Sequence, residues 1–414
     1  MGAGHSHRAD RSDSELRVRA LPRRVLLGML AAAAVATVVG LFSLWPQGDR
    51  VSELADSVSF AAPGVTFPRA TVDEVQPPCP TVQDEAGRTS FPRPGEDQRC
   101  GRIRVTLAEG AGDGAATAVE VPPQVSESGL REGDQVKLMR VPGTDGQPAT
   151  YSYFGTERGQ PLLLLAGLFA MVVIAVAWLR GLFAILGLGF SAWLIGTFLL
   201  PGVLSGQSAV WVGLVASSAI MFVVLYTTHG FTLRTSTALA GTLLGLVTTA
   251  GIGYLSVGAT RLTGVSDEGG GVLQSFASQL DFQGLLTCAV MIAGLGVLND
   301  VTITQASAVW ELRAASGTMS RARLWASGMR IGRDHIASTI YTIAFAYAGT
   351  ALTLLLVLQL YDLPVLDLLA TEEITQEVVR TLATSIGLVL AVPLTTAIAV
   401  AVVPGPEDGV EPVG

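Results

Sequence analysis

The sequence predicts a mainly α, polytopic helical membrane protein with about eight transmembrane helices and a small extracytoplasmic β-rich domain between helices 1 and 2. Half of the 414 residues are hydrophobic and only 14% are charged, and mean hydropathy is +0.50. Soluble domains are about a quarter charged, so this composition is typical of membrane proteins. A polar stretch rich in proline and glycine, residues 46–160, interrupts the apolar segments and predicts the separate domain.

The N-terminal residues 1–24 form a predicted cytoplasmic tail that carries six arginines. Residues 25–45 are almost continuously apolar and are long enough to cross a bilayer. The run is too long for the core of a typical signal peptide, and no clear small-residue cleavage site follows it. We therefore expect an uncleaved transmembrane anchor; the alternative is a cleaved signal peptide.

The domain at 46–160 contains short runs in which apolar and polar residues alternate or nearly alternate. These runs predict strands at Arg102–Leu107, Ala118–Val121 and Asp134–Val141, separated by turns rich in glycine and proline. About 110 residues can bury only a modest core, so we expect a small β-rich domain, barrel-like in form. Its acids are scattered and it contains no histidine, which favours a structural role.

Three cysteines are present, and two of them, Cys79 and Cys100, bracket one polar loop of this domain. They can form a disulfide if the domain lies outside the cytoplasm. With no histidine nearby they would make a poor metal site. Cys288 lies in an apolar segment, where a packing role is expected.

From residue 161 to residue 403 the sequence predicts a membrane domain of about seven helices, followed by an acidic cytoplasmic tail at 404–414. The predicted spans are Leu162–Leu179, Leu182–Leu200, Ala209–Tyr226, Thr235–Val257, Gly284 to about Ile303, Ile336–Leu360 and Val379–Val403.

Arginine placement predicts the orientation of these spans. With the N-terminus in the cytoplasm, the inner segments collect thirteen basic residues, whereas outside the β-rich domain the opposite side holds only Arg261 and Arg380. Both termini are therefore expected in the cytoplasm. The near absence of lysine and the abundance of arginine and alanine suggest a bacterial source, and hence the bacterial cytoplasmic membrane.

A polar stripe follows directly from an apolar segment near the middle of the membrane domain. Asp300, Thr304, Ser307 and Glu311 recur at i, i+4, i+7 and i+11. A helix turns about 100° per residue, so they share one narrow face about 16 Å long. Carboxylates in hydrocarbon are costly, so the stripe predicts a water-filled path or an ion-binding face. The alternative is that the helix leaves the bilayer near Asp300 and the stripe is solvated.

His229 lies in the predicted cytoplasmic turn 227–237, on the same membrane side as Asp300. Histidine titrates near neutral pH, so His229 is a candidate to relay protons to a carboxylate. The alternative is an interfacial histidine without that role.

The predicted outer loop 361–377 is acidic, and Glu373, Glu377 and Arg380 share one helical face at its end. Glu377 and Arg380 are spaced for an i, i+3 ion pair. The functional interpretation is a charged mouth that concentrates cations. The alternative is an amphipathic helix that lies on the membrane surface.

The sequence does not favour an enzyme. An intramembrane aspartyl protease needs two embedded aspartates, and Asp300 is the only candidate. No glycine-rich loop followed by lysine indicates a nucleotide site, and no nucleophile paired with histidine is evident. No concentrated basic surface indicates nucleic-acid binding. We expect no cofactor, no metal and no catalytic residue.

Three separated blocks resemble the YibE/F-like integral membrane proteins, particularly the actinobacterial form. The blocks are GLGVLNDVTITQASAVWELR at 294–313, HGFTLRTSTALAGTLLG at 229–245 and EEITQEVVRTLATSIGLVLAVPLTTAIA at 372–399. The resemblance covers about 160–403 and implies a multi-pass protein of the bacterial cytoplasmic membrane, of a family described as predicted transporters without an established substrate. It implies importance for Asn299, Asp300, Thr302, Thr304, Gln305, Ser307, Glu311, Arg380 and Pro393.

The first hypothesis is a transporter-like membrane protein that moves an ion or small polar solute past the stripe. The further transport or ion-binding candidates are Asn299, Gln305, His229 and Arg380. The expected partners are the lipid bilayer and a cation or small polar solute. The alternative hypothesis is a structural or accessory membrane protein that presents its outer β-rich domain to a partner complex, with the stripe paired internally to Arg313 or His335.

Overall fold

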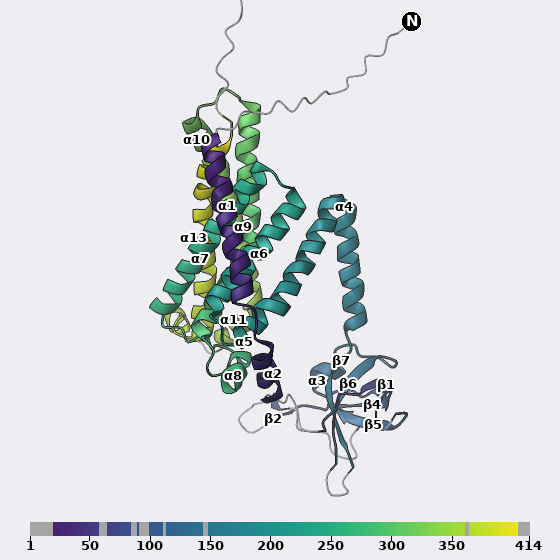
Figure 1. Ribbon diagram of the computed structural model, residues 1–414. Coiled ribbons are helices and arrows are strands. Elements are labelled where there is room, and N and C mark those ends of the chain that lie inside the picture. The colour runs from purple at the N-terminus through teal and green to yellow at the C-terminus, as the bar shows by residue number, and fades with distance from the viewer. Residues whose placement is uncertain are drawn as a thin grey trace, which may run out of the picture. The chain divides into compact units, whose positions relative to one another are not determined.

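A computed structural model describes residues 20–57, 64–83, 89–90, 99–110, 113–143, 148–360 and 364–404. The chain divides into two compact units (Figure 1). The helical unit comprises Met1–Ala55 and Val173–Gly414, and the sheet unit comprises Asp56–Val172. Each unit is described by itself below.

The sheet unit is built on five antiparallel strands in the order β5-β4-β1-β6-β7 (Figure 1). The strands are β1 (Arg69–Val75), β4 (Arg102–Leu107), β5 (Ala116–Glu120), β6 (Gln135–Val141) and β7 (Thr150–Thr156), with a small pair β2 (Val82–Gln83) and β3 (Thr89–Ser90) and a short helix α3 (Pro123–Ser126). The edge strands β5 and β7 approach each other, so the sheet curls into a half-barrel. A barrel-like β-rich fold was predicted for this region.

The three predicted strands correspond to β4, β5 and β6, whereas β1 and β7 were not predicted. In β1 a bulge between Val72 and Glu74 interrupts the register with β4. A bulge adds one residue to one strand and breaks the alternation on which strand prediction relies. β7 combines aromatic residues with Gly155, which also obscures the pattern.

Alternate residues of β1, β4 and β6 point into one apolar core, which includes Val72, Ile103, Val105 and Leu138. Each of these side chains is at most 1% exposed. Their neighbours point outward, as expected for strands with one buried face. The alternation seen in the sequence therefore marks the true core.

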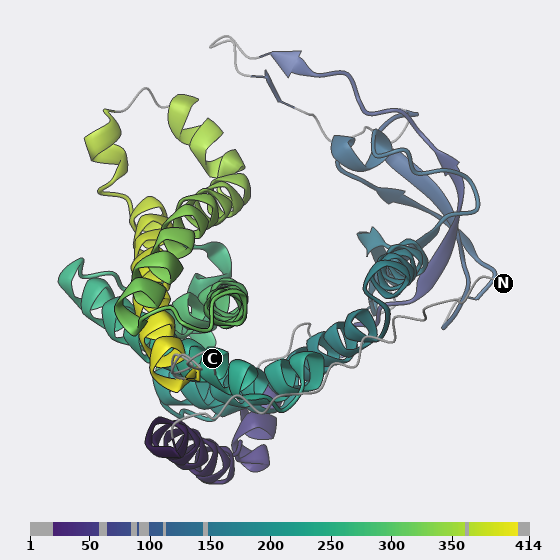
Figure 2. The same ribbon diagram turned by 90° about the horizontal axis from the view of Figure 1, so that it is seen from above.

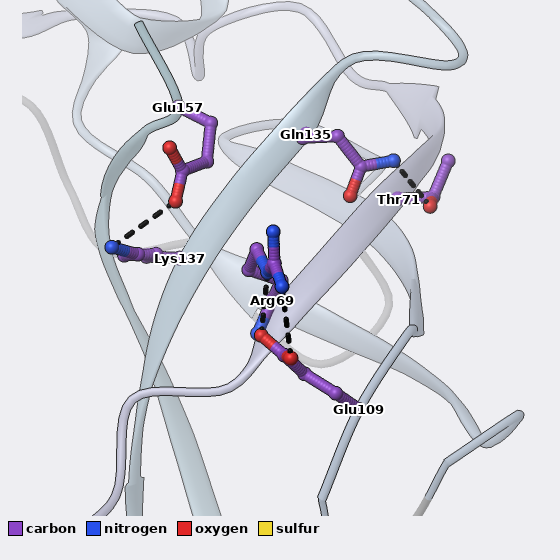
Figure 3. Close-up of polar contacts among 6 residues, drawn as sticks. All are labelled: Arg69, Thr71, Glu109, Gln135, Lys137 and Glu157. Carbon is purple, nitrogen blue, oxygen red and sulfur yellow. Dashed lines mark hydrogen bonds and ion pairs between the residues drawn. The ribbon is translucent and has the colours of Figure 1, made fainter. Parts of the chain in front are cut away.

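The outer face of the sheet carries polar pairs between neighbouring segments (Figure 3). Arg69 and Glu109 lie 2.6 Å apart and Lys137 and Glu157 lie 3.1 Å apart. The hydrogen bond from Arg69 holds the pKa of the Glu109 carboxyl below its ordinary value. This pair therefore stabilises the fold above the ordinary pKa of glutamate, and that contribution is lost as the pH falls. Because the pair is exposed, the contribution is small.

A disulfide joins Cys79 and Cys100, as predicted, with 4.8 Å between their Cα atoms. It closes a loop between residues 21 positions apart and anchors the end of β1 to the start of β4. Both half-cystines are buried. The bond therefore supports a domain whose apolar core is small.

Replacing Cys79 by serine is expected to lower the stability of the sheet unit by about 3 kcal/mol, because the open loop gains entropy in the unfolded state. Hydrogen exchange of the β1 and β4 amides in the full-length protein measures this effect, with Cys288→Ala as the control. Unchanged exchange in Cys79→Ser would show that the bond contributes nothing to the sheet.

The helical unit contains most of the long helices (Figure 1). Its helices, together with α4, which begins in the sheet unit, are α1 (Ala20–Ser43), α2 (Gly48–Ser57), α4 (Gly159–Leu194), the π-helix η1 (Ile195–Leu199), α5 (Leu200–Leu204), α6 (Ala209–His229), α7 (Leu233–Ala259), α8 (Glu268–Phe276), α9 (Phe282–Ala315), α10 (Arg321–Thr350), α11 (Leu352–Leu360), α12 (Val365–Leu368) and α13 (Glu372–Val402). Among the described residues six helices are long and apolar enough to cross a membrane. A seventh is added if α10 and α11, bent by 62°, count as one span.

The two spans predicted at Leu162–Leu179 and Leu182–Leu200 fall in one helical run that breaks at Trp178. Trp178 has φ 52°, in the left-handed region, so the helix turns sharply there. Beyond the turn, an added Cβ on Gly181 would lie 2.4 Å from the carbonyl oxygen of Val173. Glycine is therefore required at the break. The count of about eight spans remains a prediction.

Helices α7 and α13 pack closely against each other as an antiparallel pair, and α9 packs against both. An added Cβ on Gly241 would lie 2.1 Å from Thr395 Oγ1, and one on Gly387 would lie 1.9 Å from Thr249 Oγ1. Each helix therefore places a glycine opposite a threonine of the other. Gly241 therefore has a packing role. Figure 2 shows α13 (yellow) beside α10 (green) in the same bundle.

Candidate functional site

Helix α9 carries the predicted stripe without interruption. The side chain of Asp281 accepts a hydrogen bond from the Gly284 amide, 2.8 Å away, and caps the N-terminus. The helix ends at Ala315. The guanidinium of Arg313, in the last turn, donates hydrogen bonds to the carbonyls of Gly317 and Met319, which follow the helix. All four stripe residues consequently lie in one continuous helix, as their spacing required.

The stripe lies on the open face of α9. The side chains of Asp300 and Glu311 are 68% and 74% exposed, Thr304 is exposed and Ser307 is half-buried. Other parts of the α9 surface pack against α6, α7, α10 and α13. The two carboxylates therefore lie where no described element of the bundle covers them.

Each carboxylate of the stripe faces a basic side chain from a neighbouring helix. Asp300 Oδ2 lies 3.9 Å from His335 Nε2 on α10, and Glu311 Oε1 lies 3.5 Å from Arg234 Nη1 on α7. The first separation is beyond hydrogen-bond range, so this contact is an ion pair only when the imidazole carries a proton on both nitrogens. The stripe is thus bracketed by a titratable base near one end and a permanent cation at the other.

The structure places the other sequence-predicted residues apart from this face. His229 ends α6, and its Nδ1 lies 2.7 Å from Thr228 Oγ1. Within the described part of the chain, the base that faces Asp300 is His335 and not His229. Arg380 lies on α13 and forms the predicted ion pair with Glu377, at 2.8 Å. Neither His229 nor Arg380 makes an ion pair with the stripe among the described residues.

Asn299 and Gln305 turn away from the stripe. Gln305 is only 2% exposed; its Nε2 donates to Thr396 Oγ1 at 2.7 Å and to the Gly328 carbonyl at 2.9 Å. Asn299 is half-buried. Gln305 therefore holds α9 to α10 and α13, which favours a structural role for it.

A buried polar layer beside the stripe was not predicted. Thr242 on α7 and Thr302 on α9 are both fully buried, and their hydroxyls lie 2.6 Å apart. Polar groups in an apolar core require partners, and here the partners come from other helices. The sequence signal is the presence of threonine and glutamine one turn apart, at 302 and 305, within an apolar helix.

The stripe offers oxygen and imidazole groups on an exposed surface. Among the residues that the structure describes, no three histidine, cysteine, aspartate or glutamate side chains gather closely enough to hold a metal ion. Carboxylates and hydroxyls of this kind can bind cations or polar groups through charge and hydrogen bonds.

The sequence of the chain matches a known protein family. The family model of the YibE/F-like protein matches residues 165–405, which is more than half of the chain. The chain belongs to the YibE/F-like family. No curated protein and no solved structure matches it.

The YibE/F-like region begins within α4 and extends through α13, so it contains the stripe, its two basic partners and the α7–α13 pair. The strands of the sheet unit lie before it. The predicted resemblance is confirmed. Family membership together with the long apolar helices indicates a membrane protein.

Proposed function

We propose that this YibE/F-like protein is transporter-like and moves an ion or small polar solute past Asp300, Thr304, Ser307 and Glu311. One observation carries the proposal: two largely exposed carboxylates lie on the open face of a helix whose N-terminal half is apolar. A carboxylate facing hydrocarbon is strongly disfavoured. Water or a polar solute at this face removes that penalty.

The groups along the face have distinct chemical roles in this proposal. Asp300 is the charge partner or proton acceptor, with His335 as its neighbouring base. The hydroxyls of Thr304 and Ser307 are secondary ligands, and Glu311 is an exit or gating group whose charge is balanced by Arg234. Hard oxygen ligands favour protons, sodium or a divalent cation over soft metals.

In this proposal the protein lies in the bacterial cytoplasmic membrane, and both of its termini lie in the cytoplasm. The basic residues at the start of α10, including Arg321 and Arg323, then lie on the cytoplasmic side. The sheet unit lies outside, where the disulfide of Cys79 and Cys100 persists.

A second candidate function is an accessory protein whose stripe is paired internally. The 3.9 Å contact between Asp300 and His335 favours it, because an internal ion pair is what a purely structural stripe requires. In that case the outer sheet unit is presented to a partner complex. The large exposed fraction of both carboxylates favours the transport proposal instead.

Cysteine accessibility along residues 296–312 tests the proposal. In a Cys288→Ala background, a membrane-impermeant thiol reagent applied from the cytoplasmic side is expected to label cysteines at 300, 304, 307 and 311. Labelling is expected to continue to 296, because Gly296 is exposed on the same face. Cysteines at the buried positions 298, 301 and 305 are the matched controls and are expected to be protected.

The two candidate functions predict different patterns of cysteine labelling. Uniform labelling beyond about residue 302, with none before it, would mean that the helix simply leaves the membrane. That pattern would contradict the transport proposal and favour the accessory role.

A further inference from the structure

A cavity of about 390 Å³ lies at the N-terminal end of α13, remote in sequence from the α9 stripe. The segment before α8 contributes Ser266 and Asp267, the junction of α10 and α11 contributes Tyr347 and Thr350, and α13 contributes its first polar turns. Its volume lies in the range of small-molecule sites.

Negative charge prevails in this cavity. Asp267, Glu373 and Glu377 line it together with a single cation, Arg380. Arg380 Nη1 is 2.8 Å from Glu377 Oε1. One guanidinium cannot balance three carboxylates, so the cavity favours a positively charged occupant.

Two acceptor atoms at the cavity are buried without a partner among the described residues. They are Glu377 Oε2, the oxygen that Arg380 does not use, and Gln376 Oε1. A buried acceptor without a donor is costly, most of all on a carboxylate. The Nε of Arg380, a donor, is also buried there without a hydrogen-bond partner. The two acceptors require N–H or O–H donors, and a donor that also carries positive charge satisfies them and reduces the negative charge of the cavity.

An apolar cavity of about 310 Å³ adjoins the charged one. The two share Tyr347, Ala351 and Glu377 in their linings, and the apolar cavity continues along Val378 and Leu382. An occupant whose charged group lies at Glu377 therefore has space for a hydrocarbon part beside it.

Hydrogen bonds to Glu372 fix one wall of the charged cavity. The Glu372 carboxylate accepts hydrogen bonds from the Thr263 amide at 2.7 Å, the Thr263 hydroxyl at 2.6 Å and the Gly264 amide at 3.0 Å. These bonds fix the segment that leads into Ser266 and Asp267 against the start of α13. The position of Asp267 in the wall is therefore set by the fold.

We infer that this pair of cavities binds a primary ammonium group attached to a short apolar chain. Glu377 Oε2 and Gln376 Oε1 accept the ammonium N–H bonds, and the chain lies along Val378 and Leu382. The binding does not depend on transport past the α9 stripe. A free alkylamine and the ethanolamine headgroup of a phospholipid share this chemistry.

Calorimetric titration of the full-length protein in phosphatidylcholine nanodiscs tests the inference, with hexylammonium as the probe. Hexylammonium is expected to bind saturably. Hexanoate has the opposite charge and trimethylhexylammonium lacks N–H donors, so neither is expected to bind comparably. Glu377→Gln is expected to weaken hexylammonium binding about ten-fold or more, because a charged hydrogen-bond acceptor is lost.

Asp367→Asn is the matched control, because it removes one exposed carboxylate near the same end of α13 without touching the cavity. It is expected to bind hexylammonium as the unchanged protein does. Equal affinity in Glu377→Gln, equal loss in Asp367→Asn, or comparable binding of hexanoate would overturn the inference.

A second variant keeps the carboxylate and narrows the apolar cavity. Val378→Phe is expected to weaken the binding of hexylammonium while leaving the binding of methylammonium unchanged. Equal effects on both amines would overturn the placement of the apolar chain.

Nanodiscs containing phosphatidylethanolamine distinguish the two possible sources of the ammonium group, a lipid headgroup and a free amine. A weaker apparent affinity for hexylammonium there identifies the lipid headgroup as the ligand, and an unchanged affinity identifies a free amine.

Discussion

Cation flux through the reconstituted protein is expected to fall by about ten-fold or more when Asp300 is replaced by asparagine, because hydrogen bonds to a charged group contribute ~1.5–3 kcal/mol. Asparagine keeps the size and shape of the side chain, but it replaces one acceptor oxygen by an NH2 donor and removes the charge and the ability to take a proton. The contact with His335 loses its electrostatic basis at the same time. Proteoliposomes with a trapped pH indicator, and a parallel assay with labelled sodium, measure the flux.

Asp334→Asn is the control for this experiment. Asp334 is exposed, precedes His335 on α10, and forms no ion pair within the described part of the chain. The charge change is the same, and flux is expected to stay at the level of the unchanged protein. Unchanged flux in Asp300→Asn, at equal protein abundance, would remove the transport proposal.

Gly387→Ala is expected to lower the thermal stability of the protein, and this is the second large effect. The new Cβ would lie 1.9 Å from Thr249 Oγ1 and 3.2 Å from the Thr249 Cα, so the α7 backbone must move. Thr249 cannot simply rotate away, because its hydroxyl donates to the Gly245 carbonyl at 2.9 Å. Overpacking of this kind costs about 1–3 kcal/mol, which corresponds to a fall of roughly 5 °C in Tm.

Gly251→Ala, on the partner helix α7, is the control. Nothing lies within 4 Å of a Cβ at that position, and alanine favours a helix over glycine. Its Tm is therefore expected to hold or rise. Thr249→Gly combined with Gly387→Ala reverses the arrangement and is expected to recover part of the loss. An unchanged Tm in Gly387→Ala would contradict the close approach of α7 and α13.

Much of the fold follows from local patterns in the sequence. Runs of apolar residues predict most of the long helices, because a helix satisfies its own backbone groups in an apolar surrounding. The exception is the predicted span Ile336–Leu360, which the structure divides between α10 and α11 with a bend of 62°. Strand alternation predicts β4 and β6, whose inward residues form the core of the sheet unit. The Glu377–Arg380 pair was also predictable, since both residues lie within one turn of one helix.

The stripe on α9 shows where local information ends. Helical periodicity determines that Asp300, Thr304, Ser307 and Glu311 share a face, but it does not determine which side of the bundle that face occupies. The packing of α6, α7, α10 and α13 against the rest of α9 leaves both stripe carboxylates largely exposed, with Asp300 beside α10 and Glu311 beside α7.

The sequence by itself determined most of the apolar helices, the presence of a β-rich region and the alignment of the stripe, because each depends on residues close together in the chain or on their simple period. Only the tertiary structure decided that His335 faces Asp300, that Arg234 faces Glu311, and that Gly387 meets Thr249. These contacts join helices far apart in sequence. Their distances depend on how whole helices pack, and no local pattern contains that information.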